Sequence, residues 1–128
     1  MNQLELEKAV RKNVHELLEE KKYVYSVDLL MKLGYLSKPD YEKWRFGKVD
    51  YLERLCKVNL SKLTLINKEL RIISKELNLK ASWTAYMKHG KGAKKKLRFS
   101  KSNKESIERA YATHYVLRKK PPIKPKEV

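Results

Sequence analysis

The sequence predicts an α+β protein that is mainly helical, and two observations carry this prediction. Before residue 80, apolar residues recur at the three- and four-residue spacings of amphipathic helices. After residue 80, apolar and polar residues alternate over residues 81–87 and 96–100, as they do in half-buried strands. We therefore expect a helical bundle followed by a small antiparallel β-hairpin or sheet.

The length and composition favour one folded unit. The chain has 128 residues, of which 41% are hydrophobic, and this is enough for one domain with a real core. We find no internal repeat and no Gly/Ser-rich linker, so we expect a single compact domain over residues 1–117, helical over residues 1–80 and β-containing over residues 81–117. Residues 118–128 are basic and rich in proline, which predicts an extended or disordered tail.

The first expected helix covers residues 3–22. Its apolar stripe consists of Leu6, Val10, Val14 and Leu17. The aromatic and β-branched link at residues 23–25 follows, and the sequence leaves open whether it is an extended connection or a small strand.

Two short helices joined by a glycine turn come next. Ser26 is a cap candidate for the first, and Gly34 stands where a left-handed residue would end it. Ser37 is the cap candidate for the second, with Pro39 tolerated in its first turn, and this helix is expected to end at Gly47.

The next two helices have different lengths. Apolar residues after residue 47 predict a third short helix that ends near Asn59. Ser61 is then a cap candidate for a longer helix over residues 62–78, whose apolar seam consists of Leu63, Ile66, Leu70, Ile73 and Leu77. The seam fits a core helix with two neighbours, and the alternative is a homodimer through residues 62–78.

The C-terminal part predicts a β-hairpin over residues 82–100 with a basic tip, and we expect Trp83 and Phe99 in the core. The alternative is that these two aromatic residues are exposed platforms on which bases stack. Ser102 has the spacing of a capping box, so a helix is expected to begin at Asn103. Residues 111–117 either continue that helix or form a third strand, and their alternation favours the strand.

Residues 26–55 resemble the helix-turn-helix of DNA-binding proteins. The resemblance is carried by a set of apolar, capping and turn residues: Leu30, Leu33, Gly34, Ser37, Tyr41, Trp44, Arg45, Gly47 and Lys48. It implies that the second helix reads DNA, with Trp44 packed inward. The later basic hairpin is similar to the wing of a winged helix, but about 35 residues separate it from the motif, whereas a wing normally follows directly.

The charge is the strongest functional signal in the sequence. The formal net charge is +16, and residues 81–128 hold 14 Lys and Arg against 3 Glu. Residues 88–101 contain seven cations and no acid. Such a concentration attracts polyanions, of which nucleic acid is the leading hypothesis, with DNA ahead of RNA.

The cations favour contact with the phosphate backbone. Lysines outnumber arginines, and lysine binds phosphate as a point charge, whereas arginine suits bidentate contacts to guanine. The predicted nucleic-acid-binding residues are Lys38, Lys43, Arg45, Lys48, Lys88, Lys91, Lys94, Lys95, Lys96, Arg98 and Lys101.

Two other classes of function stay open. The first is a non-enzymatic adaptor whose helical part binds a protein partner. The second is a metal-independent nuclease that uses His89 and His114 with a lysine. The sequence holds no phosphate loop, nucleophile elbow or metal-ligand spacing, so we expect no enzyme, cofactor or metal.

Cys56 is expected to be a small buried side chain. The absence of a signal core or an apolar membrane span favours a cytoplasmic protein without membrane attachment.

Overall fold

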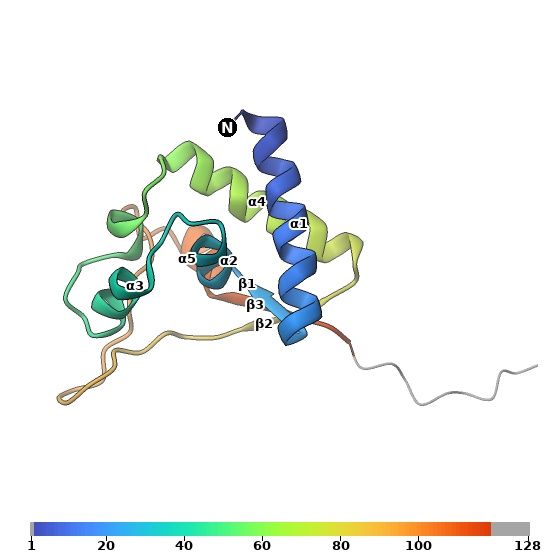
Figure 1. The fold of residues 1–128 in the computed structure, drawn as a ribbon. Coiled ribbons are helices and arrows are strands. Elements are labelled where there is room, and N and C mark those ends of the chain that lie inside the picture. The colour runs from blue at the N-terminus through green and yellow to red at the C-terminus, as the bar shows by residue number, and fades with distance from the viewer. Residues whose placement is uncertain (1, 119–128) are drawn as a thin grey trace, which may run out of the picture.

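The computed structural model describes residues 2–118 (Figure 1) and confirms the α+β, mainly helical fold class. The elements of this range, in chain order, are α1 (Gln3–Lys21), β1 (Tyr23–Tyr25), α2 (Ser26–Lys32), α3 (Lys38–Arg45), the 3₁₀ helix η1 (Leu52–Leu55), α4 (Leu60–Glu76), β2 (Lys80–Trp83), α5 (Glu105–Ala112) and β3 (Thr113–Val116). Apart from Arg118, the predicted basic tail lies outside the described residues. The division into one domain and a tail stays a prediction.

Helices α1 and α4 pack against each other and bury the two predicted apolar stripes. Figure 1 shows α1 crossing α4. The predicted stripe of α1 is buried, and Lys22 ends the helix in the left-handed conformation. From the predicted seam of α4, Leu63, Ile66, Leu70 and Ile73 are buried within the chain. Leu77 lies beyond the last turn and is exposed.

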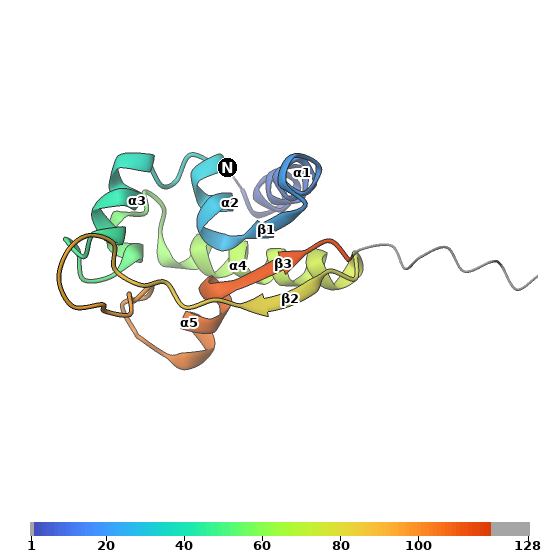
Figure 2. The ribbon, with the colours of Figure 1, turned by 90° about the horizontal axis from the view of Figure 1, so that it is seen from below.

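The three strands form an antiparallel sheet in the order β1-β3-β2. The central strand, β3, is the last in the chain, and its Tyr115 pairs with Val24 of β1 and with Ala81 of β2. The strand expected in residues 111–117 is therefore confirmed over Thr113–Val116, and α5 ends just before it. The link at residues 23–25 is a strand, so the sheet combines both halves of the sequence. Figure 2 shows α4 behind β3 and β2.

The predicted helical hairpin is present in α2 and α3. Gly34 has φ +84° and ends α2, while Tyr35 N donates to Leu30 O at 3.0 Å. The Ser37 side chain accepts from Asp40 N at 3.2 Å and caps α3, as expected. The Ser26 prediction was wrong, because Ser26 is already the first residue of α2 and its hydroxyl donates to Asn67 Oδ1 instead of capping the helix.

Three helix starts or extents differ from the predictions. The helix expected after residue 47 is only the 3₁₀ turn of η1. Asn59 caps α4 in place of Ser61, since its side chain accepts from Lys62 N at 2.9 Å. Helix α5 begins at Glu105 instead of Asn103, because Asn103 has φ +56°, which an α-helix cannot contain.

The predicted β-hairpin is shorter than expected. Strand β2 pairs with β3, and the hairpin contacts are the bridge between Met87 and Lys96 with a flanking bond from Lys88 N to Lys95 O at 2.7 Å. Phe99 is buried as predicted. The prediction of a buried Trp83 was wrong: this side chain is 55% exposed, and the other three residues of β2 are exposed as well.

Within residues 2–118, no helix combines the length and the apolar composition that crossing a membrane requires.

Candidate nucleic-acid interface

Two basic segments that are far apart in sequence meet in the structure. We call residues 88–96 the basic loop. Figures 1 and 2 both show it beside α3. His89 N donates to the carbonyl of Arg45 at 2.7 Å, and Arg45 Nε donates back to His89 Nε2 at 3.1 Å. The C-terminal end of α3 and the basic loop therefore form one continuous surface.

Two glycines allow this close approach. Gly47 has φ +74° and Gly90 has φ +96°, a region that other residues rarely adopt. A Cβ on Gly47 would lie 3.1 Å from the Lys88 side chain, and a Cβ on Gly90 would lie 3.1 Å from the Phe46 ring. The Phe46 ring meets the His89 ring edge-on at 5.8 Å. A larger residue at either glycine would strain the backbone at positive φ, and the Lys88 or Phe46 side chain would have to shift slightly.

An aromatic cluster beneath the surface fixes α3 against the stem of the basic loop. Trp44 of α3 is fully buried, as expected, and its ring centre lies 5.6 Å from Tyr86 and 5.0 Å from Phe99. Its indole nitrogen donates to Arg98 O at 2.8 Å. The guanidinium of Arg45 lies over the Tyr86 ring at 4.9 Å.

The predicted lysines divide by exposure. Most side chains in the group are exposed: Lys38, Lys43, Lys48, Lys91, Lys94, Lys95, Lys96 and Lys101. Lys88 is half-buried against Gly47, and Lys43 lies 3.8 Å from Asp40 in an ion pair. No lysine of the basic loop takes part in any ion pair found within residues 2–118. Their positive charge is therefore available to a ligand.

The two predicted arginines are held by the protein itself. Arg98 Nε donates to Ser100 O at 2.7 Å, its guanidinium also donates to the Lys101 carbonyl, and it lies over the Tyr51 ring at 5.3 Å. Arg45 is committed to His89 and Tyr86. Both guanidinium groups are therefore engaged within the protein, whereas the lysines of the basic loop take part in no ion pair within residues 2–118.

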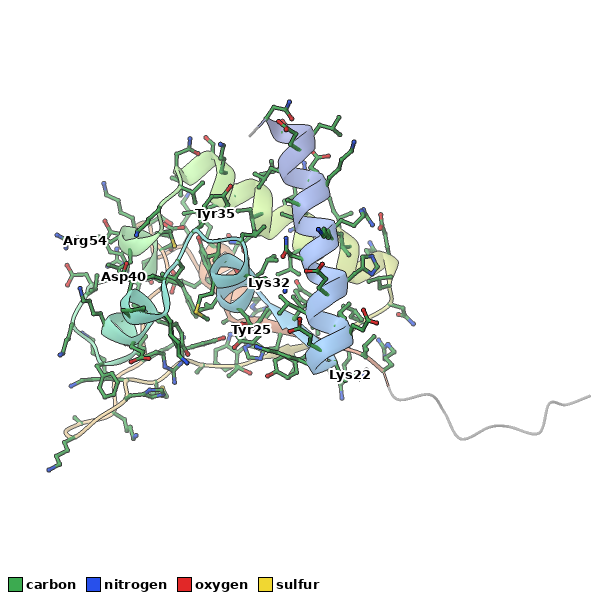
Figure 3. All side chains as sticks on the ribbon, viewed as in Figure 1. Lys22, Tyr25, Lys32, Tyr35, Asp40 and Arg54 are labelled. Atoms are coloured by element: carbon green, nitrogen blue, oxygen red, sulfur yellow. The ribbon has the colours of Figure 1, made fainter. Side chains whose placement is uncertain are left out.

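The two histidines proposed for a nuclease occupy structural positions. His89 accepts from Arg45, and His114 stacks on Tyr25 with ring centres 4.1 Å apart. Figure 3 places Tyr25 below α2. The Tyr86 hydroxyl and His114 Nε2 are 2.8 Å apart, and burial lowers the pKa of His114. No group of residues within the described range is arranged to hold a metal ion.

Cys56 is half-buried rather than fully buried. Burial raises the pKa of its thiol to about 12, and the sulfur lies 3.7 Å from the Leu52 carbonyl. The thiol is therefore protonated at neutral pH, which agrees with the expected non-reactive role.

Sequence reasoning missed two features of this region. The first is Tyr86, which links Trp44, Arg45 and His114. The second is the exposed indole of Trp83, with Lys96 Nζ 5.4 Å from its ring centre. The interleaving of aromatics with lysines was the only signal for either residue.

Comparison with known proteins gives no relative for this chain: no family model, curated protein or solved structure matches it.

Proposed function

We propose that this protein binds nucleic acid in the cytoplasm, through one surface built from α3 and the basic loop. The observation that supports this most is the junction at Arg45 and His89. It unites the lysine-rich loop with the helix that resembles a recognition helix. When exposed lysines without acidic partners contact phosphates, they displace the counterions that surround the nucleic acid. This release stabilises the complex, and the binding therefore weakens as the salt concentration rises.

We favour DNA as the ligand because α3 follows the glycine turn after α2 and resembles, in its sequence, the second helix of a helix-turn-helix. Its outward side chains include Lys38, Glu42 and Lys43, which are all exposed. The lysines of the basic loop contact the backbone beside it and add affinity without sequence information. Recognition by α3 and anchoring by the loop together define the proposed role, a DNA-binding protein without catalytic activity.

The test is a charge-matched pair of triple variants. Lys94→Gln/Lys95→Gln/Lys96→Gln removes three cations from the basic loop, and Lys62→Gln/Lys68→Gln/Lys75→Gln removes three from α4. We expect the loop variant to bind labelled DNA more weakly at every salt concentration. The plot of the logarithm of the binding constant against the logarithm of the salt concentration should become less steep. The magnitude of its slope should decrease by roughly 2–3 if each lysine contacts a phosphate. Fluorescence anisotropy at several salt concentrations measures both quantities.

The α4 variant is the control, because its net charge changes by the same amount away from the loop. It should keep the wild-type slope. Equal losses in the two variants would show that only the overall charge matters, and would contradict the assignment to the α3 and loop surface.

A protein-binding adaptor is the second candidate, and one observation favours it. A groove of about 350 Å³ lies between the first turns of α1 and α4, lined in part by Leu6, Ser61 and Leu65. Leu4 and Leu60, from the same two turns, are each 60% exposed. Capture of a partner after nuclease treatment, lost on Leu60→Ser, would favour this class over DNA binding.

A further inference from the structure

A small cavity lies at the base of the basic loop, and Trp83 forms part of its wall. It measures about 100 Å³, and its lining includes Trp83, Tyr86, Lys96, Phe99, Glu105 and Arg109. Trp83 is 55% exposed, and its aromatic surface is therefore open to a ligand. Lys96 connects this cavity to the loop lysines that precede it in the chain.

The charges around the cavity balance each other. Glu108 also lines it, but its carboxylate accepts from Phe99 N at 2.9 Å and from Ser100 N at 2.7 Å. Glu105 lies 3.7 Å from Arg109 in an ion pair. Two cations and two carboxylates around one small space do not favour a phosphate there. A flat, uncharged group suits the cavity better, and the phosphates then belong on the open lysines of the loop.

We propose that this cavity takes one unpaired nucleobase, stacked on the indole of Trp83, while the adjoining phosphates lie along the basic loop. The inference rests on the proposed function and adds strands with unpaired bases to the ligands of the surface. Aromatic stacking accepts any base, because every base has a π-face. The Lys96 ammonium lies over the indole in the free protein, and on binding the base replaces it there while the ammonium turns to the phosphate of the stacked nucleotide.

A duplex cannot use this site in the same way. Its bases are covered on both faces by their neighbours, so only unpaired or extruded bases can stack on a protein ring. The lysines, in contrast, contact single and double strands alike. Preference for a single strand therefore has to come from the cavity.

The experiment compares Trp83→Ala with Tyr23→Ala. Tyr23 is the matched control, since it is a partly exposed aromatic residue on β1, the opposite edge strand. Three labelled probes of equal length are used: a single-stranded DNA, the same strand with abasic sites in place of bases, and its duplex. Trp83→Ala should weaken binding of the single strand by roughly 5- to 150-fold, the range for one stacked base, and leave the abasic strand unchanged.

Two further readouts separate stacking from general damage. Trp83→Tyr keeps an aromatic face and should retain most of the affinity that alanine removes. The fluorescence of Trp83 should be quenched by the single strand but not by the abasic one. The fluorescence of the buried Trp44 is a constant background in the wild type. The Trp83→Ala variant contains only Trp44 and therefore measures this background by itself.

The failures of the two proposals are distinguishable. If no probe binds at low salt, the nucleic-acid function itself fails. If the wild type binds all three probes and Trp83→Ala binds the single strand as well as the wild type does, the function stands and the base site is overturned. A loss on the abasic strand equal to that on the single strand would also overturn it.

Discussion

Tyr86 joins three parts of the molecule through one buried side chain. Its ring packs between Trp44 and Phe99, the Arg45 guanidinium lies over it, and its hydroxyl bonds His114. Burial raises its pKa, so the hydroxyl keeps its proton and stays a hydrogen-bonding group at neutral pH. At the residue scale, burial also lowers the pKa of His114.

The pH dependence of stability should report the position of His114. Burial lowers its pKa in the folded protein against the opposing effect of Asp28, whereas the unfolded chain keeps an ordinary value near ~6.5. The unfolded state therefore binds more protons, and the free energy of unfolding should fall as the pH drops from 7 towards 5. Urea unfolding of the wild type and His114→Gln at several pH values measures this.

The other two histidines are present in both proteins, so the comparison isolates His114. The variant should therefore lose less stability over the same pH interval than the wild type does. Parallel pH profiles in the two proteins would contradict a buried, neutral His114.

The helix ends show how far local sequence determines structure. Gly34 ends α2 and Ser37 caps the start of α3, and each does so through its own backbone or side chain. These two helix ends could therefore be predicted from the sequence. The start of α4 could not, because Asn59 and Ser61 are both good caps two residues apart, and the choice depends on which turn the core accepts. At the element scale, α4 therefore offers a direct comparison of two candidate caps.

Alanine substitutions should separate the two caps of α4. Asn59→Ala removes the side chain that accepts from Lys62 N and should reduce the free energy of unfolding by about 0.5–2 kcal/mol. Ser61 is exposed inside the first turn, and Ser61→Ala should change it by less than about 0.5 kcal/mol. Chemical denaturation of both variants measures the difference, and a larger loss at Ser61 would contradict the observed cap.

The candidate site was only partly predictable for the same reason. The lysine run and the helix α3 could both be predicted from the sequence, but nothing local indicated that Arg45 and His89 would form a hydrogen bond. Alternation correctly predicted that Phe99 is buried, but it wrongly predicted the same for Trp83. The pattern does not show whether another part of the chain covers a strand. The partner of β2 comes from another part of the chain, and local patterns carry no information about it.

At the scale of the whole molecule, α1 and α4 share one core. The seam that suggested a dimer is buried against the same chain, so its apolar area is already removed from water. Within residues 62–78, the exposed large apolar side chains are those of Ile72 and Leu77, which is little area for a stable interface.

We therefore expect a monomer in solution. Sedimentation equilibrium over a range of protein concentrations should give the mass of one chain, without a trend towards higher mass. A mass of two chains that returns to one on Ile72→Lys would instead establish the homodimer through residues 62–78.

The strand order also has a consequence for when the protein can fold during synthesis. Neither β1 nor β2 has a partner until β3 enters between them, and β3 is made after every other element. Tyr23 can pair only after Val116 has been synthesised, about 90 residues later in the chain. While the chain is still attached to the ribosome, both outer strands therefore present unpaired edges, which are prone to association with other chains. Completion of the sheet is a late and cooperative event, and a chain that stops before Thr113 would lack the strand that joins its two halves.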